Sequence, residues 1–257
     1  LQQCKKRILV SQLFGGVGTM SSLSEHALLL LENFSKALGL SAPETAWHTA
    51  RDRTTEFISV LALISGGLAR SANEICQLAK NEIDELAEPF QSGQIGSTTM
   101  PHKKNPERCE QVVVLSKLIK ANAMCGFDTL GSEHERDYRT VRLEWVALTE
   151  AIIFCSAALR LYKKIIRDVI VNEAQIQNNL QQGAILISTE ALMFLLGKKI
   201  GKQSAHELLY KASQLCSSTG KELIDVLLKD ARVSSNFSKT DLEQTVLPEN
   251  HVGYSGE

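Results

Sequence analysis

Several features are scarce in this sequence of 257 residues, and each absence narrows the class of protein. Prolines number only five, and aromatic residues make up 5% of the chain. Because proline ends helices, its scarcity leaves room for long uninterrupted ones. Neither sign of charge dominates, with 28 basic and 29 acidic residues. Without a basic excess the chain lacks the field that holds DNA or RNA, so nucleic acid is not expected as a partner.

Cysteine spacing and apolar runs add further exclusions. The six cysteines are scattered, without a C-x-x-C pair or a Cys/His cluster at metal-ligand spacing, which predicts reduced thiols, a cytoplasmic location and no metal site. The longest strongly apolar stretch, residues 57–69, is shorter than the roughly 20 residues of a membrane span, so no membrane segment is predicted. No signal-peptide pattern follows Leu1, and we expect the chain to be a piece of a longer protein.

Helical periodicity is the strongest positive signal. Apolar residues recur at steps of three, four and seven along residues 54–86, 108–123 and 140–166, as one face of a long helix requires. Strand-like runs are absent except for a short Val/Ile patch at 165–171. The sequence therefore predicts an all-α fold, with a central long-helix bundle domain over residues 1–168. Shorter helices are predicted over residues 173–198, 204–217 and 220–229, punctuated by Gly and Ser. They predict a smaller helical C-terminal subdomain over residues 169–257.

A long loop, residues 88–106, lies between two of the predicted helices. It combines two glycines and three consecutive hydroxyl residues with the basic group His102, Lys103 and Lys104. Loops of this length inside a compact domain are usually functional or disordered. Pro106 suits the first turn of the next helix, whose N-terminal amides favour anions. We interpret the segment as an anion-receiving loop, with a solvated linker as the alternative.

Ten residues of this loop, from position 96, read G-S-T-T-M-P-H-K-K-N. The run resembles the signature G-S-S-x-M-P-x-K-x-N of the fumarase/aspartase superfamily, with Thr98 at the second serine. The resemblance implies that Ser97 is a base that removes a proton next to a substrate carboxylate. It also implies that Lys103 and Asn105 hold that carboxylate and stabilise the developing charge, without any metal or organic cofactor.

Two more segments extend the resemblance. Residues 15–19, G-G-V-G-T, resemble the family's G-x-x-G-T turn, and residues 47–53, W-H-T-A-R-D-R, resemble a segment that adenylosuccinate lyases share with muconate cycloisomerases. A capped helix start is the alternative for the second segment. The substrate-binding residues implied by the family motifs are Gly18, Thr19, Thr49, Arg53, Thr98, Met100, His134 and Arg136.

Two charged residues among the site candidates also have a purely structural interpretation. Glu110 matches an acidic position of the adenylosuccinate lyases, where it would join the catalytic set by orienting Lys103. A helix-surface glutamate is the alternative. Arg136 is a candidate anion ligand, and a structural ion pair with Glu133 or Asp137 is the alternative.

Residues 132–145 discriminate between branches of the family. Adenylosuccinate lyases of this type follow H-E-R-D with x-S-x-S-S-x-E-R, whose serines and arginine help to bind the nucleotide phosphate. This chain has Arg139, Val141 and Arg142 at the serine positions and Trp145 at the final arginine. The E-W-x-A-L run that begins at Glu144 resembles the bacterial 3-carboxy-cis,cis-muconate cycloisomerases instead.

The resemblance therefore implies a cycloisomerase that acts on a small polycarboxylate. Adenylosuccinate lyase, or a related lyase that releases fumarate from another succinyl adduct, is the alternative. A non-catalytic structural protein is a third interpretation. Family members are homotetramers with active sites shared between subunits, and the same assembly is expected here. In relatives the proton-donating and orienting histidines come from segments earlier than Leu1, so the fragment alone is expected to be catalytically incomplete. None of its six histidines fills those places, and His26, His48, His206 and His251 are expected at the surface or at helix ends.

Overall fold

The structure, a computed structural model, describes residues 1–89 and 105–255. The chain divides into two compact units, unit 1 (Leu1–Val171) and unit 2 (Asn172–Glu257). In the described ranges the regular structure is helical except for one two-stranded sheet. The prediction of an all-α fold is confirmed.

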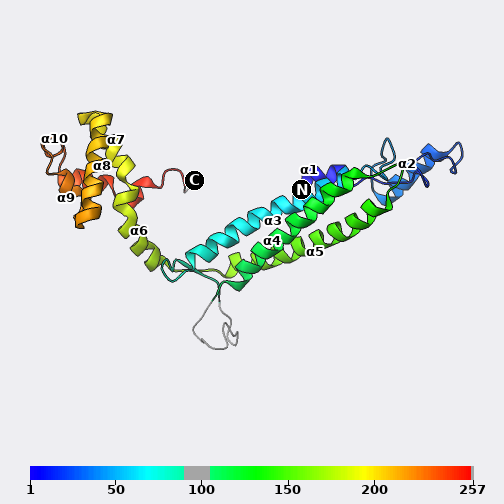
Figure 1. Cartoon of the computed structure of the whole chain (residues 1–257), viewed down its shortest axis with the longest axis horizontal. Helices are drawn as coiled ribbons and strands as arrows, with labels where there is room; N and C mark the ends of the chain where they lie inside the picture. Colours follow the sequence, from blue (N-terminus) through cyan, green and yellow to red (C-terminus); the bar gives the residue numbers. More distant parts are fainter. Residues whose placement is uncertain (90–104, 256–257) are drawn as a thin grey trace. The chain divides into compact units, whose positions relative to one another are not determined.

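Unit 1 is built on three long helices that run side by side (Figure 1). Its elements are α1 (Gln2–Ile8), α2 (Ala27–Leu38), α3 (Asp52–Leu78), β1 (Leu86–Ala87), α4 (Glu107–Asp128), η1 (Thr129–Gly131), α5 (Tyr138–Asp168) and β2 (Ile170–Val171). Each of α3, α4 and α5 packs against the other two, and α1 lies against α3. β1 pairs with β2 in antiparallel fashion, with Leu86 opposite Val171.

The long helices form where the periodicity predicts them, with one difference at a helix end. α3 ends at Leu78 rather than near residue 86. A turn follows in which Asp84 adopts a φ of 51°, and the chain then enters β1. A left-handed residue cannot continue a right-handed helix, so apolar spacing alone overestimates its length.

Small residues line the seam between α3, α4 and α5. The buried seam residues with small side chains are Ser65, Ala72, Ser116, Ala123, Gly126, Ala147, Ala151 and Ala158. At Gly126 an added Cβ would lie 3.3 Å from Ile58 Cδ1, which is tighter than an ordinary contact. The seam therefore brings the three helices close together and has little space for larger side chains.

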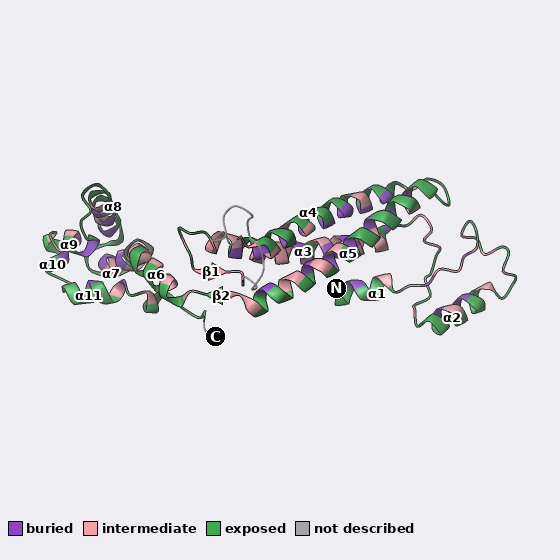
Figure 2. Cartoon of the chain, turned by 90° about the horizontal axis from the view of Figure 1, so that it is seen from below, coloured by how far each residue is buried: buried purple, intermediate pink, exposed green. Residues whose placement is uncertain are grey.

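Large apolar side chains of α4 and α5 are exposed instead, on helices with long exposed faces (Figure 2). They include Val114, Leu118, Met124, Phe127, Trp145, Val146, Ile152, Ile153, Leu159 and Ile166. By length and composition α5 is apolar enough to cross a membrane, with 22% of its most apolar window buried. The apolar runs in the sequence did not mark this helix as a candidate membrane span. Packed helices of soluble bundles pass the same test, and the absence of a membrane segment stays a prediction.

Unit 2 is a cluster of shorter helices with its own core. Its elements are α6 (Glu173–Ile187), α7 (Thr189–Ile200), α8 (Lys202–Thr219), α9 (Leu223–Leu227), α10 (Ala231–Ser234), α11 (Lys239–Thr245) and η2 (Pro248–His251). Large aliphatic residues fill the core, among them Leu192, Leu196, Leu227, Val233 and Leu242, all fully buried.

Candidate active site

The three-helix bundle of unit 1 has two ends that differ in their polar contacts. At the first, here called the Arg51 end, α3 and α5 begin and α4 finishes. At the second, called the Glu88 end, α3 and α5 finish, α4 begins, and β1 pairs with β2. The nominated residues that the structure describes are divided between these two ends.

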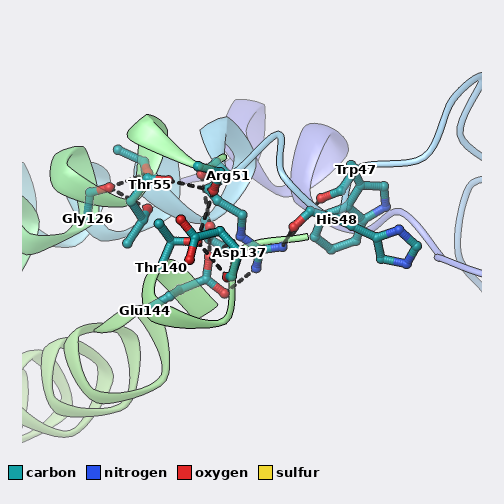
Figure 3. Close-up of polar contacts among 11 residues, drawn as sticks. Trp47, His48, Arg51, Thr55, Gly126, Asp137, Thr140 and Glu144 are labelled. Carbon is teal, nitrogen blue, oxygen red and sulfur yellow. Dashed lines mark hydrogen bonds and ion pairs between the residues drawn. The ribbon is translucent and has the colours of Figure 1, made fainter. Parts of the chain in front are cut away.

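A buried ion pair cross-links the Arg51 end (Figure 3). Arg51, which precedes α3, donates from Nε to Glu144 Oε2 at 2.7 Å and also from its terminal nitrogen to Glu144 Oε1. Thr54 donates its hydroxyl proton to the same carboxylate at 2.5 Å. The Arg51 and Glu144 side chains are 9% and 5% exposed. Pairing both charges compensates for their loss of water, so this contact joins α3 to α5.

A second ion pair occupies the segment that distinguishes the family branches. Asp137 caps α5 by accepting the backbone N–H of Arg139 at 2.9 Å, and its carboxylate also accepts from the Arg139 guanidinium. The Arg139 guanidinium holds the pKa of Asp137 down, to about 2. Glu133 lies 2.9 Å from the same guanidinium. Arg139 therefore meets two carboxylates of its own chain.

Residues near Arg139 in the sequence also contact other side chains of the same chain. The Arg142 guanidinium lies over the Tyr138 ring, 4.3 Å from its centroid, and the same ring meets Trp145 edge to face at 6.5 Å. Glu133 and Asp137, the partners considered for Arg136, are both paired with Arg139. Arg136 is exposed.

The substrate-binding candidates outside the loop lie at or near the Arg51 end. They are Gly18, Thr19, Thr49, Arg53, His134 and Arg136. Gly18 adopts a φ of 88°, a left-handed conformation that suits glycine, and an added Cβ there would be 3.9 Å from His48 Nδ1. Arg53 lies over the Trp47 ring, 5.7 Å from its centroid. Thr19 and His134 are exposed, and Thr49 and Arg53 are half-buried. The structure thus brings the turn at 15–19 to the segment at 47–53.

His48 is more enclosed than the sequence suggests. We expected a surface or helix-end residue, whereas the structure half-buries it and leaves its Nδ1 without solvent contact or a hydrogen-bond partner in the part of the chain described. Burial lowers the pKa of His48, and the charges of Arg136 and Arg51 lower it further. The imidazole is therefore biased toward its neutral form.

Of the remaining candidates, Asn105 and Glu110 lie at the Glu88 end. Ser97, Thr98, Met100 and Lys103 lie outside the described residues. Asn105 is half-buried and Glu110 is exposed, and both line a surface recess with Cys76, Gln77 and Lys80 from the end of α3. Asn105 and Glu110 therefore share one surface.

Glu88 is a contact that the sequence analysis missed. Its carboxylate accepts the backbone N–H groups of Arg108 and Cys109, at 3.0 and 3.2 Å from Oε2. Pro106, the N-cap residue of α4, makes no side-chain cap. The amides at the start of α4, which we expected to favour a bound anion, thus already hold a carboxylate of the chain itself. A partner 20 residues away leaves no local signal in the sequence.

The length of the bundle separates the two groups of candidates. α3 has 27 residues, and at ~1.5 Å per residue it spans about 40 Å. Arg53 is at its first turn, whereas the recess with Asn105 and Glu110 adjoins its last turn. Within one copy of the chain the described candidates form two separate groups.

The thiols and acidic groups show no metal-binding pattern. Over residues 1–89 and 105–255, no group of three or more His, Cys, Asp or Glu side chains is placed to hold a metal ion. The six cysteines are all unpaired thiols, and burial raises the pKa values of Cys76, Cys109 and Cys155. The expectation of a metal-free site stays a prediction.

Two family models match the chain. The model described as "Lyase" matches residues 1–120, and the model described as "Adenylosuccinate lyase C-terminus" matches residues 186–257. The chain belongs to the fumarase/aspartase superfamily, whose helical fold its structural neighbours share.

Individual relatives carry three different activities in their names. The chain is 38% identical over 253 residues to N-acetyl-S-(2-succino)cysteine lyase of Dickeya dadantii, covering 98% of this chain and 56% of the relative. It is 34% identical over 259 residues to adenylosuccinate lyase of Pyrococcus abyssi, covering 100% and 57%. The solved 3-carboxy-cis,cis-muconate lactonizing enzyme of Pseudomonas putida is 30% identical with a TM-score of 0.87, covering 98% and 56%. The chain thus spans little more than half the length of these relatives.

Proposed function

We propose that this chain is the central and C-terminal part of an enzyme that eliminates or adds a group β to a carboxylate of a small polycarboxylate without a phosphate. The state of Arg139 carries this proposal. It takes the place of a phosphate-binding serine of the adenylosuccinate lyases, yet its guanidinium pairs with Asp137 and Glu133. An arginine paired with two carboxylates has to give up these contacts before it can bind a nucleotide phosphate.

Two substrates fit this description. Identity of 38% to a lyase named for N-acetyl-S-(2-succino)cysteine favours a succinyl thioether. The E-W-x-A-L run at Glu144 and the likeness to the solved muconate lactonizing enzyme favour 3-carboxy-cis,cis-muconate cycloisomerization. We propose the thioether lyase first and the cycloisomerase second. Adenylosuccinate cleavage is the outcome that Arg139 and Arg142 oppose.

Both candidate reactions share one chemical step and its reverse. In the lyase, Ser97 removes a proton from the carbon next to a carboxylate, and an enolate-like dianion forms. Lys103 and Asn105 hold the carboxylate and stabilise the added negative charge. The carbon–sulfur bond then breaks, its electron pair leaves with the sulfur, and the carbon electrons form the double bond of fumarate. In the cycloisomerase, a carboxylate oxygen adds across a double bond in the opposite sense.

The substrate-binding residues of the Arg51 end complete the proposed site in a second copy of the chain. About 40 Å of α3 separates Arg53 from the recess with Asn105, so neither group reaches the other within one copy. The exposed apolar side chains of α4 and α5 provide a surface for assembly. We therefore propose a cytoplasmic homotetramer with shared active sites.

The direct test is turnover by the full-length protein on three substrates in parallel: the S-(2-succino) derivative of N-acetylcysteine, 3-carboxy-cis,cis-muconate and adenylosuccinate. Turnover of either of the first two, with adenylosuccinate left intact, supports the proposal. Cleavage of adenylosuccinate as the preferred substrate contradicts it.

A Ser97→Ala variant tests the base. Loss of a general base costs roughly 100- to 10,000-fold in kcat, while substrate binding is expected to survive. Thr98→Ser is the matched control, because it restores the superfamily signature and keeps a hydroxyl. Normal turnover by Ser97→Ala would reject Ser97 as the base.

A further inference from the structure

Glu88 connects the two ends of the segment that carries the superfamily signature. It directly follows β1 on one side of that segment, and its carboxylate accepts the amides of Arg108 and Cys109 in the first turn of α4 on the other. The Arg108 guanidinium Nε lies 3.5 Å from Glu88 Oε1. The Glu88 side chain is only 5% exposed. Glu88 is thus a buried, charged cap supplied from 20 residues away.

The backbone that carries Glu88 is itself fixed. Leu86 and Ala87 pair with Val171 and Ile170, and Leu86 packs against the buried cluster that includes Ile75 and Cys109. The backbone next to Glu88 is therefore held in place by strand pairing and by packing. A local Ser or Asp cap would satisfy the same amides, but it would leave the two ends of the segment unconnected.

Among the described residues near the start of α4, few other groups could bind its first backbone amides. Pro106 offers no side-chain cap. Glu107 is exposed. Burial and the neighbouring Glu88 carboxylate raise the pKa of Cys109, which keeps this thiol neutral. Among the described residues, the cap of the α4 amides is the Glu88 carboxylate.

We propose that Glu88 is a positioning residue, which sets where the first turn of α4, and with it Asn105 and Glu110, lies relative to the end of α3. The inference rests on the proposed function, since Asn105 is a residue that would hold the substrate carboxylate. The Glu88 carboxylate is buried against these amides. It acts through the start of α4, two residues after Asn105.

The test compares Glu88→Ala and Glu88→Gln with Glu107→Gln in the full-length protein. Glu107→Gln is the matched control, because it removes one carboxylate charge from the same helix turn without removing the cap. Glu88→Ala is expected to lower kcat about 10- to 100-fold, as misplaced catalytic groups do, at a temperature where it is fully folded. Glu88→Gln, which keeps one acceptor oxygen, is expected to recover part of that loss, and Glu107→Gln to stay within about twofold of the wild type.

Amide hydrogen exchange gives a readout independent of turnover. Exchange at Arg108 and Cys109 is expected to quicken about tenfold in Glu88→Ala and to be unchanged in Glu107→Gln. A folded Glu88→Ala with wild-type kcat, or with unchanged exchange at these amides, overturns the inference. If Glu88→Ala does not fold, the same criteria apply to Glu88→Gln.

The two proposals fail in different ways. If the wild-type protein turns over none of the three substrates, the proposed function fails, and the exchange measurement alone decides whether Glu88 holds the start of α4. If the wild type is active and the Glu88 variants match it, only the positioning role fails.

Discussion

The two units bury small and large side chains in different proportions. In its long-helix seam unit 1 mixes Ala, Ser and Gly with Ile, Leu and Val, and it exposes large apolar side chains on α4 and α5. Unit 2 buries Leu, Ile and Val residues in a core of its own. Small buried residues supply less hydrophobic stabilisation per residue than large aliphatic ones. Covering the exposed apolar face of α4 and α5 would therefore add a large share to the stability of unit 1.

The largest expected effect comes from charging that outer face. Ile153 is 57% exposed on α5, and Ile153→Asp would place a carboxylate in the proposed subunit interface. We expect the assembly to dissociate and turnover to be lost, because an unpaired buried charge is strongly unfavourable. Light scattering of the full-length protein measures the assembly. Tyr210→Asp, at a 60% exposed position of unit 2, is the control, and an intact assembly in Ile153→Asp would remove this helix from the interface.

The next largest effect is expected from creating a cavity in the aliphatic core of unit 2. Leu227 is fully buried, and Leu227→Ala is expected to lower the free energy of unfolding of unit 2 by about 3 kcal/mol. Chemical denaturation followed by a probe in unit 2 measures this change. Leu215→Ala, at a 42% exposed position, is expected to change it by less than about 0.5 kcal/mol. Equal losses in both variants would show that unit 2 lacks a packed core.

In unit 1 the informative substitution replaces a small buried side chain by a larger one. Ala151 is fully buried in the seam, and Ala151→Leu is expected to destabilise unit 1 by about 2 kcal/mol through overpacking. Ala37→Leu, at an exposed position on α2, makes the same chemical change outside the seam and outside the exposed apolar face of α4 and α5. Thermal unfolding of the two variants distinguishes them. A stable Ala151→Leu would mean that the seam has unused space.

The smallest effect concerns a capping motif found in both units. Asp137 caps α5 and pairs with Arg139, as Asp230 caps α10 and pairs with Arg232, and each arginine holds the pKa of its aspartate down, to about 2 from 3.8. A lowered folded-state pKa stabilises the fold above pH 3.8, and this contribution is lost as the pH falls toward 2.

Replacing either aspartate by asparagine should therefore cost stability near neutral pH and progressively less in acid. Urea midpoints at about pH 6 and about pH 2.5 measure the change. Asp137→Asn is expected to have the larger effect, because it caps a helix of 31 residues whereas Asp230 caps one of 4. A cost that is the same at both pH values would exclude the ion pairs as its source.

Much of the fold follows from periodicity, but where helices stop does not. The apolar steps predict α3, α4 and α5, yet the single predicted helix 173–198 is interrupted at Ser188, between α6 and α7. The buried Ser188 hydroxyl donates to the carbonyl of Val246, 58 residues away. A contact of this range has no local sequence pattern.

The candidate site shows the same limit. Motif residues such as Asn105 and Arg53 are recognisable because they sit in short linear patterns. Glu144 is the partner of Arg51 across 93 positions, and Glu88 caps an amide 20 positions away, so neither role could be predicted from spacing. Arg139 rather than Arg136 pairs with Asp137 because capping α5 orients the Asp137 carboxylate toward the residue two positions on.

The pairing of β1 with β2 has a mechanical consequence. β2 is the last element of unit 1, and Asn172, the first residue of unit 2, is bonded directly to it. Any pull on unit 2 is therefore transmitted to Val171 and, through the strand pairing, to Leu86, two residues before Glu88. A load on unit 2 would therefore reach the residues beside Glu88 through two strand residues, as well as α5 through the chain itself.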